Sequence, residues 1–443
     1  MYEKLKKWKA VSQGKTAILI EGARRIGKST LVEEFAKNEY DDYLLLDFSI
    51  ESDEVKNEFE KNIGKLDTFF MNLFLLKDKT LKSRNSLIIF DEVQLFPKAR
   101  QAIKHLVKDN RFDYIETGSL IGIKENVEGI LLPSEEHIEK MYPMDFEEFL
   151  WATNNEITID VMKKAIEENI ALDDSIHRKI MEKFRTYICV GGMPQAVDAF
   201  ITAKNYNEVD NAKKEIITLY ENDIRKKNLV NGGKSSLVFK SLTSQIANNK
   251  SHFKYSIINK SARAQNYIEA IDFLEESMIV NVARNLTDPK VELSTSIDYS
   301  DIKMFFGDTG LFVTKAMSDN KEFGNDLYKR IIFDKDSSNL GPIYENIVAQ
   351  MLKAQGYDLL FNTYKYMGEK KYEIDFIIKN NKHLIPIEVK SSAYKNHKSL
   401  DNFYKKFNIK RDNSFIVYTK NYKKEEKVVY LPVYMVGFDF LNL

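Results

Sequence analysis

A glycine-rich segment near the N-terminus, GARRIGKST at residues 22–30, has the residue types and spacing of a phosphate-binding loop. Gly22 and Gly27 let the backbone turn so that successive N–H groups point at phosphate oxygens. Lys28 is expected to reach the β- and γ-phosphates, and the Ser29 hydroxyl is expected to bind Mg²⁺. A helix that starts at Lys28 adds the partial positive charge of its N-terminus. The segment therefore predicts a site for ATP or GTP.

The carboxylates that triphosphate hydrolysis requires follow an apolar run at residues 87–90. Asp91 is expected to hold the Mg²⁺ ion through water, and Glu92 to orient and deprotonate the attacking water, so Lys28 and Glu92 are the predicted catalytic residues. Farther along, Thr117 or Ser119 in the segment ETGSL is a candidate sensor of the γ-phosphate. The residues assigned to the nucleotide and its metal are Gly22, Arg24, Arg25, Gly27, Lys28, Ser29, Thr30, Asp91 and Ser119.

A second charged set, in the last hundred residues, has the composition of a metal-dependent phosphodiesterase site. Glu345, Asp375 and Glu388 supply carboxylate oxygens, which suit Mg²⁺ or Mn²⁺. The metal would polarise a phosphodiester and activate water, while Lys390 would stabilise charge or assist the nucleophile as a catalytic residue. The alternative is that Glu388 and Lys390 simply pair on a sheet and do no chemistry.

Strands and a helix must position these C-terminal residues. Residues 374–378 and 384–389 are apolar runs joined by KNNKH, which predicts a β-hairpin. Glu388 and Lys390 are two apart, so they project from the same face. Residues 341–357 predict a helix, with Pro342 in its first turn and Gly356 at its C-terminal cap. Glu345 shares the apolar face of this helix, where a carboxylate is costly unless a positive charge meets it.

The phosphate-binding loop likewise lies between a predicted strand and a predicted helix. Residues 17–20 form a short apolar run typical of a buried strand, and Leu31, Val32 and Phe35 then recur at helical spacing. Residues 156–230 predict helices that form a nucleotide lid or, alternatively, a packing domain that never moves. A break in these helices is expected at Gly191 and Gly192, before Pro194.

Residues 234–285 predict three helical stretches followed by a strand, the plan of a winged helix. The helical stretches are expected at 235–249, 256–263 and 264–277, and the strand at 278–285. In that plan Lys260, Arg263 and Gln265 lie near the recognition helix, which makes DNA a predicted partner. Residues 302–312, IKMFFGDTGLF, predict a strand and a turn that pack on this domain.

The amino-acid composition limits the classes of protein to which the chain can belong. The 443 residues are 43% hydrophobic and 30% charged, which is typical of globular domains. Net charge is zero, but residues 341–443 hold 17 Lys or Arg against 11 Asp or Glu, a balance that permits nucleic-acid binding. The single cysteine, Cys189, excludes an intrachain disulfide and fits a reducing compartment. With no signal-peptide pattern and no 18-residue apolar run, a cytoplasmic protein without membrane spans is expected.

Seven segments occur in an order that resembles one family. They are GARRIGKST, IIFDEVQ, TGSL, YPMDFEEFLW, GGMP, YENDIRK and FFGDTGLF. The order is similar to that in archaeal and bacterial AAA-type ATPases with a domain of unknown function of the DUF4143 type and a nuclease-like C-terminus. The resemblance implies an adenine nucleotide and no agreed biological role. Many members carry a Gly-Arg pair shortly before the YP motif, and this sequence has no Arg there. Arg24, Arg25 and Arg225 remain the candidates for an arginine that acts on a neighbouring copy.

The C-terminal set resembles the PD-(D/E)xK nuclease superfamily, matched by Glu345, Asp375, Glu388 and Lys390. This sequence departs from the usual Pro-Asp of the first motif, since Glu373 and Ile374 precede Asp375. The resemblance implies a restriction-endonuclease-like fold with a bound metal and nuclease activity. The alternative is that the fold is retained without activity.

Together these features predict an α/β multidomain protein with five segments. They are a P-loop NTPase core (1–155), a helical lid (156–232), a winged-helix-like domain (233–312), a linker (313–340) and a restriction-endonuclease-like α/β domain (341–443).

The predicted function is Mg²⁺-dependent ATP binding and hydrolysis, with action on DNA through the winged helix and the nuclease-like domain. The alternative is a nucleotide-gated protein-interaction switch whose nuclease-like domain is inactive. Predicted partners are ATP, DNA, and further copies of the chain or another protein. Predicted cofactors are ATP and Mg²⁺, with Mn²⁺ as an option at the C-terminal site.

Overall fold

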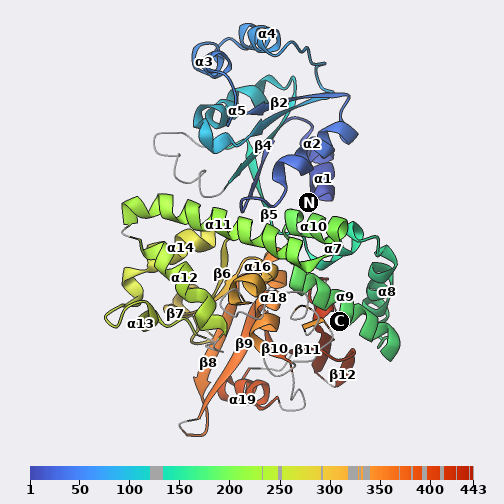
Figure 1. The fold of residues 1–443 in the computed structure, drawn as a ribbon, viewed down its shortest axis with the longest axis vertical. Helices are drawn as coiled ribbons and strands as arrows, with labels where there is room; N and C mark the ends of the chain where they lie inside the picture. Colours follow the sequence, from blue (N-terminus) through green and yellow to red (C-terminus); the bar gives the residue numbers. More distant parts are fainter. Residues whose placement is uncertain are drawn as a thin grey trace. The chain divides into compact units, whose positions relative to one another are not determined.

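The computed structural model divides the chain into two compact units, described here separately (Figure 1). The first unit comprises Met1–Tyr142 with Glu276–Met278, and the second comprises Pro143–Glu275 with Ile279–Leu443. The described residues are 1–119, 133–231, 233–247, 252–290, 293–317, 328, 331–332, 340–368, 370–380, 383–391, 397–409, 414–425, 427–438 and 440–442. Most of the predicted linker 313–340 and part of the predicted hairpin turn lie outside them.

The first unit is built on a five-stranded parallel sheet with the strand order β2-β3-β4-β1-β5. The strands are β1 (Ala17–Gly22), β2 (Asp42–Asp47), β3 (Ser86–Asp91), β4 (Asp113–Ser119) and β5 (Glu136–Met141). The strand predicted at 17–20 is confirmed as β1, and the apolar run at 87–90 lies within β3. Because all five strands run the same way, the phosphate-binding loop after β1 and the polar residues that end β3 and β4 meet at one edge.

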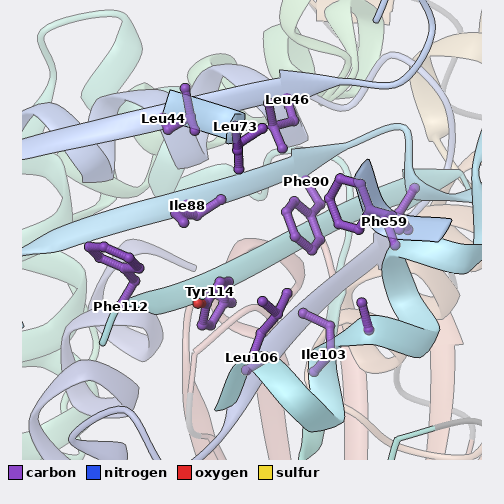
Figure 2. Close-up of a cluster of buried hydrophobic side chains, with 14 of the residues drawn as sticks. Leu44, Leu46, Phe59, Leu73, Ile88, Phe90, Ile103, Leu106, Phe112 and Tyr114 are labelled. Carbon is purple, nitrogen blue, oxygen red and sulfur yellow. The ribbon is translucent and has the colours of Figure 1, made fainter. Parts of the chain in front are cut away.

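Helices cover both faces of this sheet. On one face α1 (Tyr2–Ser12) and α2 (Lys28–Glu39) pack on β1, β3 and β4. On the other lie α3 (Asp53–Lys61), α4 (Leu66–Leu76) and α5 (Pro97–Asp109). Figure 2 shows the core beneath them, where the rings of Phe59, Phe90 and Tyr114 lie among aliphatic side chains. The ring centroids of Phe59 and Phe90 are 5.6 Å apart in edge-to-face contact. This closely packed apolar layer supports the edge of the sheet where the phosphate-binding loop and the polar residues of β3 and β4 meet, and it keeps that edge rigid.

The second unit begins with helices, as predicted for residues 156–230. They are α7 (Phe146–Ala152), α8 (Glu156–Glu168), α9 (Asp174–Val190), α10 (Pro194–Ala203) and α11 (Tyr206–Asn231). The break predicted at Gly191 and Gly192 separates α9 from α10, and Pro194 starts α10. At α7 the motif YPMDFEEFLW forms a capping box: Asp145 accepts a hydrogen bond from the Glu148 N–H at 2.8 Å, and the Glu148 carboxylate accepts from the Asp145 N–H at 3.1 Å.

The segment predicted as a winged helix has helices of different lengths from those expected. They are α12 (Lys234–Ala247), α13 (Tyr255–Ile258), the short η2 (Ala264–Asn266) and α14 (Ile268–Glu276). The helix predicted at 256–263 is wrong beyond Ile258. There Asn259 adopts an extended backbone, and its side chain accepts a hydrogen bond from the Ser261 N–H at 3.1 Å. A local side-chain acceptor of this kind competes with helix continuation.

An eight-stranded mixed sheet forms the rest of the second unit, in the order β12-β13-β11-β10-β9-β8-β6-β7. Its strands are β6 (Val280–Leu286), β7 (Ile297–Phe306), β8 (Leu360–Lys365), β9 (Lys371–Asn380), β10 (His383–Lys390), β11 (Ser414–Tyr418), β12 (Lys423–Glu425) and β13 (Val428–Pro432). The predicted hairpin is confirmed by the antiparallel pairing of β9 with β10. The strand predicted at 278–285 is confirmed as β6, which pairs antiparallel with β7 and parallel with β8 and so belongs to this sheet.

Helices pack on this second sheet as well. The predicted helix at 341–357 is confirmed as α18 (Gly341–Ala354), which lies on β7 and β10. On α19 (Lys398–Phe407), Leu400, Phe403 and Phe407 pack into an apolar cluster with β8, β9, β11 and β13. The remaining helical pieces are α15 (Leu293–Ser296), α16 (Thr309–Met317), η4 (Val433–Met435) and η5 (Phe440–Asn442).

A buried carboxylate, that of Asp308, joins separate parts of the second unit. It accepts hydrogen bonds from the Gly192 N–H at 2.7 Å and from the Leu311 N–H at 2.9 Å. The Gly192 carbonyl in turn accepts from the Met144 N–H at 2.8 Å. The bond to Leu311 caps α16, so residues 309–312, predicted as a turn, are helical. A side chain at Gly192 would collide with the Met144 backbone, which accounts for a glycine at this position.

We predict that Asp308→Ala lowers the free energy of unfolding of the second unit by about 3 kcal/mol, because it leaves two buried N–H groups without an acceptor. The two tryptophans separate the units, since Trp8 lies in the first and Trp151 in the second. In a Trp8→Phe background, urea unfolding followed by Trp151 fluorescence measures the change. The control is Asp358→Ala, whose side chain is 97% exposed, and which is expected to stay within about 0.5 kcal/mol. Equal midpoints for the two variants would contradict the prediction.

Candidate nucleotide site and a buried charge cluster

The phosphate-binding loop connects β1 to α2 and closes on its own lysine. The Lys28 ammonium donates to the carbonyl oxygens of Gly22 at 3.1 Å and Ala23 at 2.8 Å. Gly27 has φ of 90°, a conformation that L side chains rarely adopt. A Cβ on Gly22 would lie 2.6 Å from the Met141 carbonyl oxygen. Both predicted glycines are therefore required by the backbone, and Lys28 occupies the loop that is expected to receive phosphate.

Lys28 is buried, and its environment prepares it for an anion. Burial lowers the pKa of its ammonium to about 8, although the nearby carboxylates of Glu92 and Asp91 favour the charged form. The Arg24 guanidinium lowers this pKa further. A phosphate group in the loop would supply the charge that the buried ammonium lacks, because an adjacent anion favours its protonated form.

Asp91, at the end of β3, is held by hydroxyl groups from two other elements. The Ser29 hydroxyl at the start of α2 donates to its carboxylate at 2.9 Å, and the Thr117 hydroxyl on β4 donates to the same oxygen. The structure thus brings together the two predicted magnesium ligands, Ser29 and Asp91. Hydroxyl and carboxylate oxygens in contact form a donor set that fits Mg²⁺. Thr117, one of the two candidate sensors of the γ-phosphate, therefore holds Asp91 in place. Ser119, the other candidate, has no role in this contact.

Glu92 follows Asp91 in a left-handed backbone conformation, with φ of 52°. Such a conformation is uncommon for a residue with a side chain. The Gln94 side-chain amide donates to the Glu92 carboxylate. Sequence reasoning did not assign Gln94, although its place in IIFDEVQ, two residues after Glu92, was visible. Gln94 fixes the orientation of the carboxylate that is predicted to act on water.

The other residues assigned to the nucleotide lie around this centre. The side chains of Arg24, Arg25 and Thr30 are exposed, and Ser119 is half-buried at the end of β4. Arg25 has φ of 68°, so the loop is left-handed there as well as at Gly27. These four assignments remain predictions, whereas Gly22, Gly27, Lys28, Ser29 and Asp91 are placed together by the contacts described above.

The predicted C-terminal site is also assembled around β9 and β10. The Lys390 ammonium lies 3.1 Å from the Glu388 carboxylate, as expected from their shared face. The Asp375 carboxylate accepts a hydrogen bond from the Val389 N–H at 2.8 Å. Burial raises the pKa of Glu345 on α18 to about 7, while Lys303 and Lys390 act in the opposite direction. The four predicted residues therefore belong to one buried charge cluster.

A lysine that sequence reasoning missed lies within this cluster. The Lys303 side chain on β7 is 1% exposed, contacts the Glu373 carboxylate, and has its ammonium 3.9 Å from an Asp375 oxygen. Burial disfavours its charge, but Glu373, Glu345 and Asp375 outweigh this effect and raise the pKa of Lys303. The signal was a lysine inside the apolar run IKMFF. Lys303 supplies the positive charge that a buried Glu345 was predicted to need.

Glu373 extends the cluster to a histidine. His252 lies 2.9 Å from a Glu373 oxygen and 2.6 Å from an Asp301 oxygen. Hydrogen bonds to Asp301 and Glu373 raise the pKa of His252 to about 9. Burial would raise the pKa of Glu373, but Lys303 and His252 lower it to about 2. Glu373 is therefore an ionised carboxylate between two cations, a role that the sequence did not indicate.

Two of the predicted metal ligands in the C-terminal cluster lie beside lysine ammonium groups. Among the residues that the structure describes, no group of three or more His, Cys, Asp or Glu side chains is placed to hold one. Asp375 and Glu388, two of the predicted ligands, face the ammonium groups of Lys303 and Lys390 instead.

The residues predicted to contact DNA lie between α13 and α14. Lys260, Arg263 and Gln265 are all exposed there, in the segment that connects the two helices. Their contact with DNA remains a prediction. Over the described part of the chain, the helices are all too short or too polar to cross a membrane.

Three family models match successive parts of the chain. The AAA domain model (AAA_14) matches residues 14–150. Models for two domains of unknown function match residues 181–322 (DUF8612) and 340–436 (DUF4143). These matches support an AAA-type P-loop ATPase with a DUF4143 domain, which confirms that part of the predicted resemblance. The DUF4143 match falls on the segment that was predicted to be nuclease-like.

Solved structures resemble the chain only weakly. They include a RuvB variant and the RuvB Holliday junction branch migration motor, both from Thermotoga maritima, and AMPPCP-bound DnaA from Aquifex aeolicus. Identities are 12%, 11% and 12%, and TM-scores are 0.28, 0.27 and 0.22. The matches cover 65%, 65% and 76% of this chain and 89%, 88% and 92% of those chains. No curated protein matches the chain.

We predict that Lys303→Met destabilises the second unit by about 3–5 kcal/mol, because it leaves buried carboxylates without their cation. Urea unfolding in the Trp8→Phe background measures the change. The matched control is Lys379→Met, in which an exposed lysine on β9 of the same sheet is replaced. The control is expected to change stability by less than about 0.5 kcal/mol. If both variants unfold at the wild-type urea concentration, Lys303 does not balance the cluster.

Proposed function

We propose that the chain is a Mg²⁺-dependent ATPase whose first unit binds and hydrolyses ATP. The observation that carries this proposal is the contact of Ser29 with Asp91 beside a buried Lys28. The AAA domain match over residues 14–150 supports nucleotide binding and hydrolysis in general. The choice of ATP follows from the family resemblance of the sequence, and the choice of Mg²⁺ from the oxygen donors at the site.

The residues of this site have distinct roles in the proposed reaction. Lys28 exchanges its bonds to the carbonyls of Gly22 and Ala23 for bonds to the β- and γ-phosphates. Ser29 and Asp91 would hold Mg²⁺, which neutralises charge on the phosphate oxygens. Glu92 accepts a proton from the attacking water, and Gln94 keeps its carboxylate oriented. Positioning and charge stabilisation supply the rate enhancement in reactions of this type.

We expect Lys28→Ala to weaken ATP binding at least about tenfold, because it removes a charged hydrogen bond to phosphate. Glu92→Gln is expected to keep binding within about twofold and to lower turnover by about 10²–10⁴. Fluorescent-nucleotide binding and phosphate release measure the two effects. Lys37→Ala on the same helix, where the lysine is exposed and pairs with Glu33, is the control. The proposal fails if Lys28→Ala binds and turns over ATP as Lys37→Ala does.

For the second unit we propose a nucleotide-gated interaction function in which the carboxylate cluster does no chemistry. The specific observation in its favour is Lys303, whose ammonium lies among the predicted metal ligands. The competing proposal is a metal-dependent nuclease with Glu345, Asp375 and Glu388 as ligands and Lys390 as the catalytic lysine. In the nuclease, the lysine would have to leave the carboxylates before a metal ion entered.

DNA cleavage distinguishes these two proposals. Supercoiled, linear, single-stranded and branched DNA are incubated with the protein and Mg²⁺ or Mn²⁺, with and without ATP. Because the carboxylates are already paired with lysines, we expect no cleavage that Asp375→Ala removes. Asp358→Ala, which replaces an exposed carboxylate of the same unit, is the control. Cleavage that is lost in Asp375→Ala and kept in Asp358→Ala would establish the nuclease.

A further inference from the structure

A polar hollow of about 760 Å³ lies in the second unit, between α9 and the residues that follow β11. Its lining includes Arg178 and Arg185 from α9, and Lys420 and Lys423 from the other wall. Tyr418 and Tyr422 contribute aromatic surface. The volume is in the range of pockets that hold small ligands. None of these residues belongs to the nucleotide site or was assigned a role from the sequence.

The two walls of the hollow are joined by hydrogen bonds, so its shape is set before any ligand arrives. His177 lies 2.9 Å from the Tyr434 hydroxyl and 3.2 Å from the Thr419 carbonyl oxygen. The Asn421 side chain accepts a hydrogen bond from the Leu172 N–H at 3.2 Å and donates to the Leu172 carbonyl. These bonds tie the start of α9 to the turn between β11 and β12.

Positive charge predominates around the hollow. Four basic side chains line it, against the carboxylates of Asp174 and Glu182. The Arg178 side chain donates to the Asp174 backbone carbonyl at 3.2 Å. Among the described residues, neither Arg178 nor Lys420 forms an ion pair. Burial lowers the pKa of His177, and the charges of Lys420 and Arg185 lower it further while Asp174 opposes them.

The hollow also lies at the edge of the sheet where ligands bind in α/β proteins. Tyr418 ends β11, which runs parallel to β10 and β13 and pairs in register with Lys390. Ligands in such sheets occupy the carboxyl ends of parallel strands. Arg185 donates to the Tyr344 hydroxyl at 3.4 Å, and the next residue of α18 is Glu345. The hollow therefore adjoins the charge cluster that contains Lys390 and Glu345.

We propose that this hollow binds a phosphate-bearing ligand, with Arg178 and Lys420 as its main contacts to the phosphate. A guanidinium group matches phosphate geometry with two hydrogen bonds, and an ammonium group supplies a second positive charge. Both side chains are exposed and have no ion-pair partner in the described structure, so binding requires no ion pair to break. The phosphate belongs either to a free nucleotide or to the backbone of a nucleic-acid strand. The inference does not depend on the proposed ATPase, because every residue of the hollow lies in the second unit.

The test compares two double variants with equal loss of charge. Arg178→Ala with Lys420→Ala removes the proposed contacts, and Lys179→Ala with Lys424→Ala removes exposed neighbours in the sequence that do not line the hollow. All four side chains are exposed, so both variants are expected to fold. Both are placed in a Lys28→Ala background, which limits nucleotide binding at the phosphate-binding loop. The probes are a fluorescein-labelled single-stranded oligonucleotide, followed by anisotropy, and AMP, followed by calorimetry.

We expect the variant of the hollow to bind at least one probe tenfold or more weakly, and the control to remain within about twofold of its background. Loss with the oligonucleotide identifies a strand as the source of the phosphate, and loss with AMP alone identifies a nucleotide. For a strand, the slope of log K against log salt concentration is expected to fall by about 0.7 for each phosphate contact removed. Equal binding by the two variants, or an equal loss in both, would overturn the proposal.

ATP turnover tests whether the hollow acts independently of the nucleotide site in the first unit. With Lys28 intact, both double variants are expected to hydrolyse ATP at the wild-type rate, because all four substituted residues belong to the second unit. If ATP turnover fell in the Arg178→Ala, Lys420→Ala variant but not in its control, the hollow would not be independent of the ATPase. Failure of the phosphate proposal leaves the assignment of the nucleotide site unaffected, and the reverse also holds.

Discussion

The buried carboxylate of Asp308 is the contact on which the packing of the second unit depends. It joins Gly192, at the break between α9 and α10, to the start of α16, and Gly192 in turn bonds to Met144 ahead of α7. Burial raises the pKa of Asp308, while its bonds to backbone N–H groups favour the ionised form. Glycines are needed because the backbones approach too closely for a Cβ. The segments YPMDFEEFLW, GGMP and FFGDTGLF, which carry much of the family resemblance, therefore have a packing role.

Charge balance sets a second constraint in the same unit. Glu345, Glu373, Asp375 and Glu388 are buried or partly buried together, and Lys303, Lys390 and His252 oppose them. Lys303 comes from β7, which joins the sheet only because β6 pairs with β8. The β6–β7 ribbon thus brings the cation to the carboxylates. An internal cation of this kind favours an interaction module over a metal-dependent nuclease.

In the first unit, the side chains that are expected to bind phosphate and Mg²⁺ form hydrogen bonds with one another and with the loop backbone. Ser29 and Thr117 both donate to Asp91, and Lys28 bonds to the carbonyls of its own loop. The nucleotide would replace these internal bonds with bonds to phosphate and metal, and the aromatic core beneath the sheet keeps the elements in place while this happens. Preorganisation of this kind limits the rearrangement that binding requires.

By itself the sequence predicted many of the local elements and a set of residues for a nucleotide site, because glycine spacing, apolar runs and strand-end carboxylates act over short distances. It indicated β1, α2, β3, the β9–β10 hairpin and α18, and two of the residues that it assigned to the nucleotide and its metal, Ser29 and Asp91, are in contact in the structure. It misjudged the end of α13, the start of α16 and the surroundings of β6 and β7. Only the tertiary structure decided that Lys303 meets Asp375 and Glu373, and that a hollow with Arg178 and Lys420 in its lining forms beside them. These contacts join residues 70 or more positions apart, and no local pattern records which strands will pair.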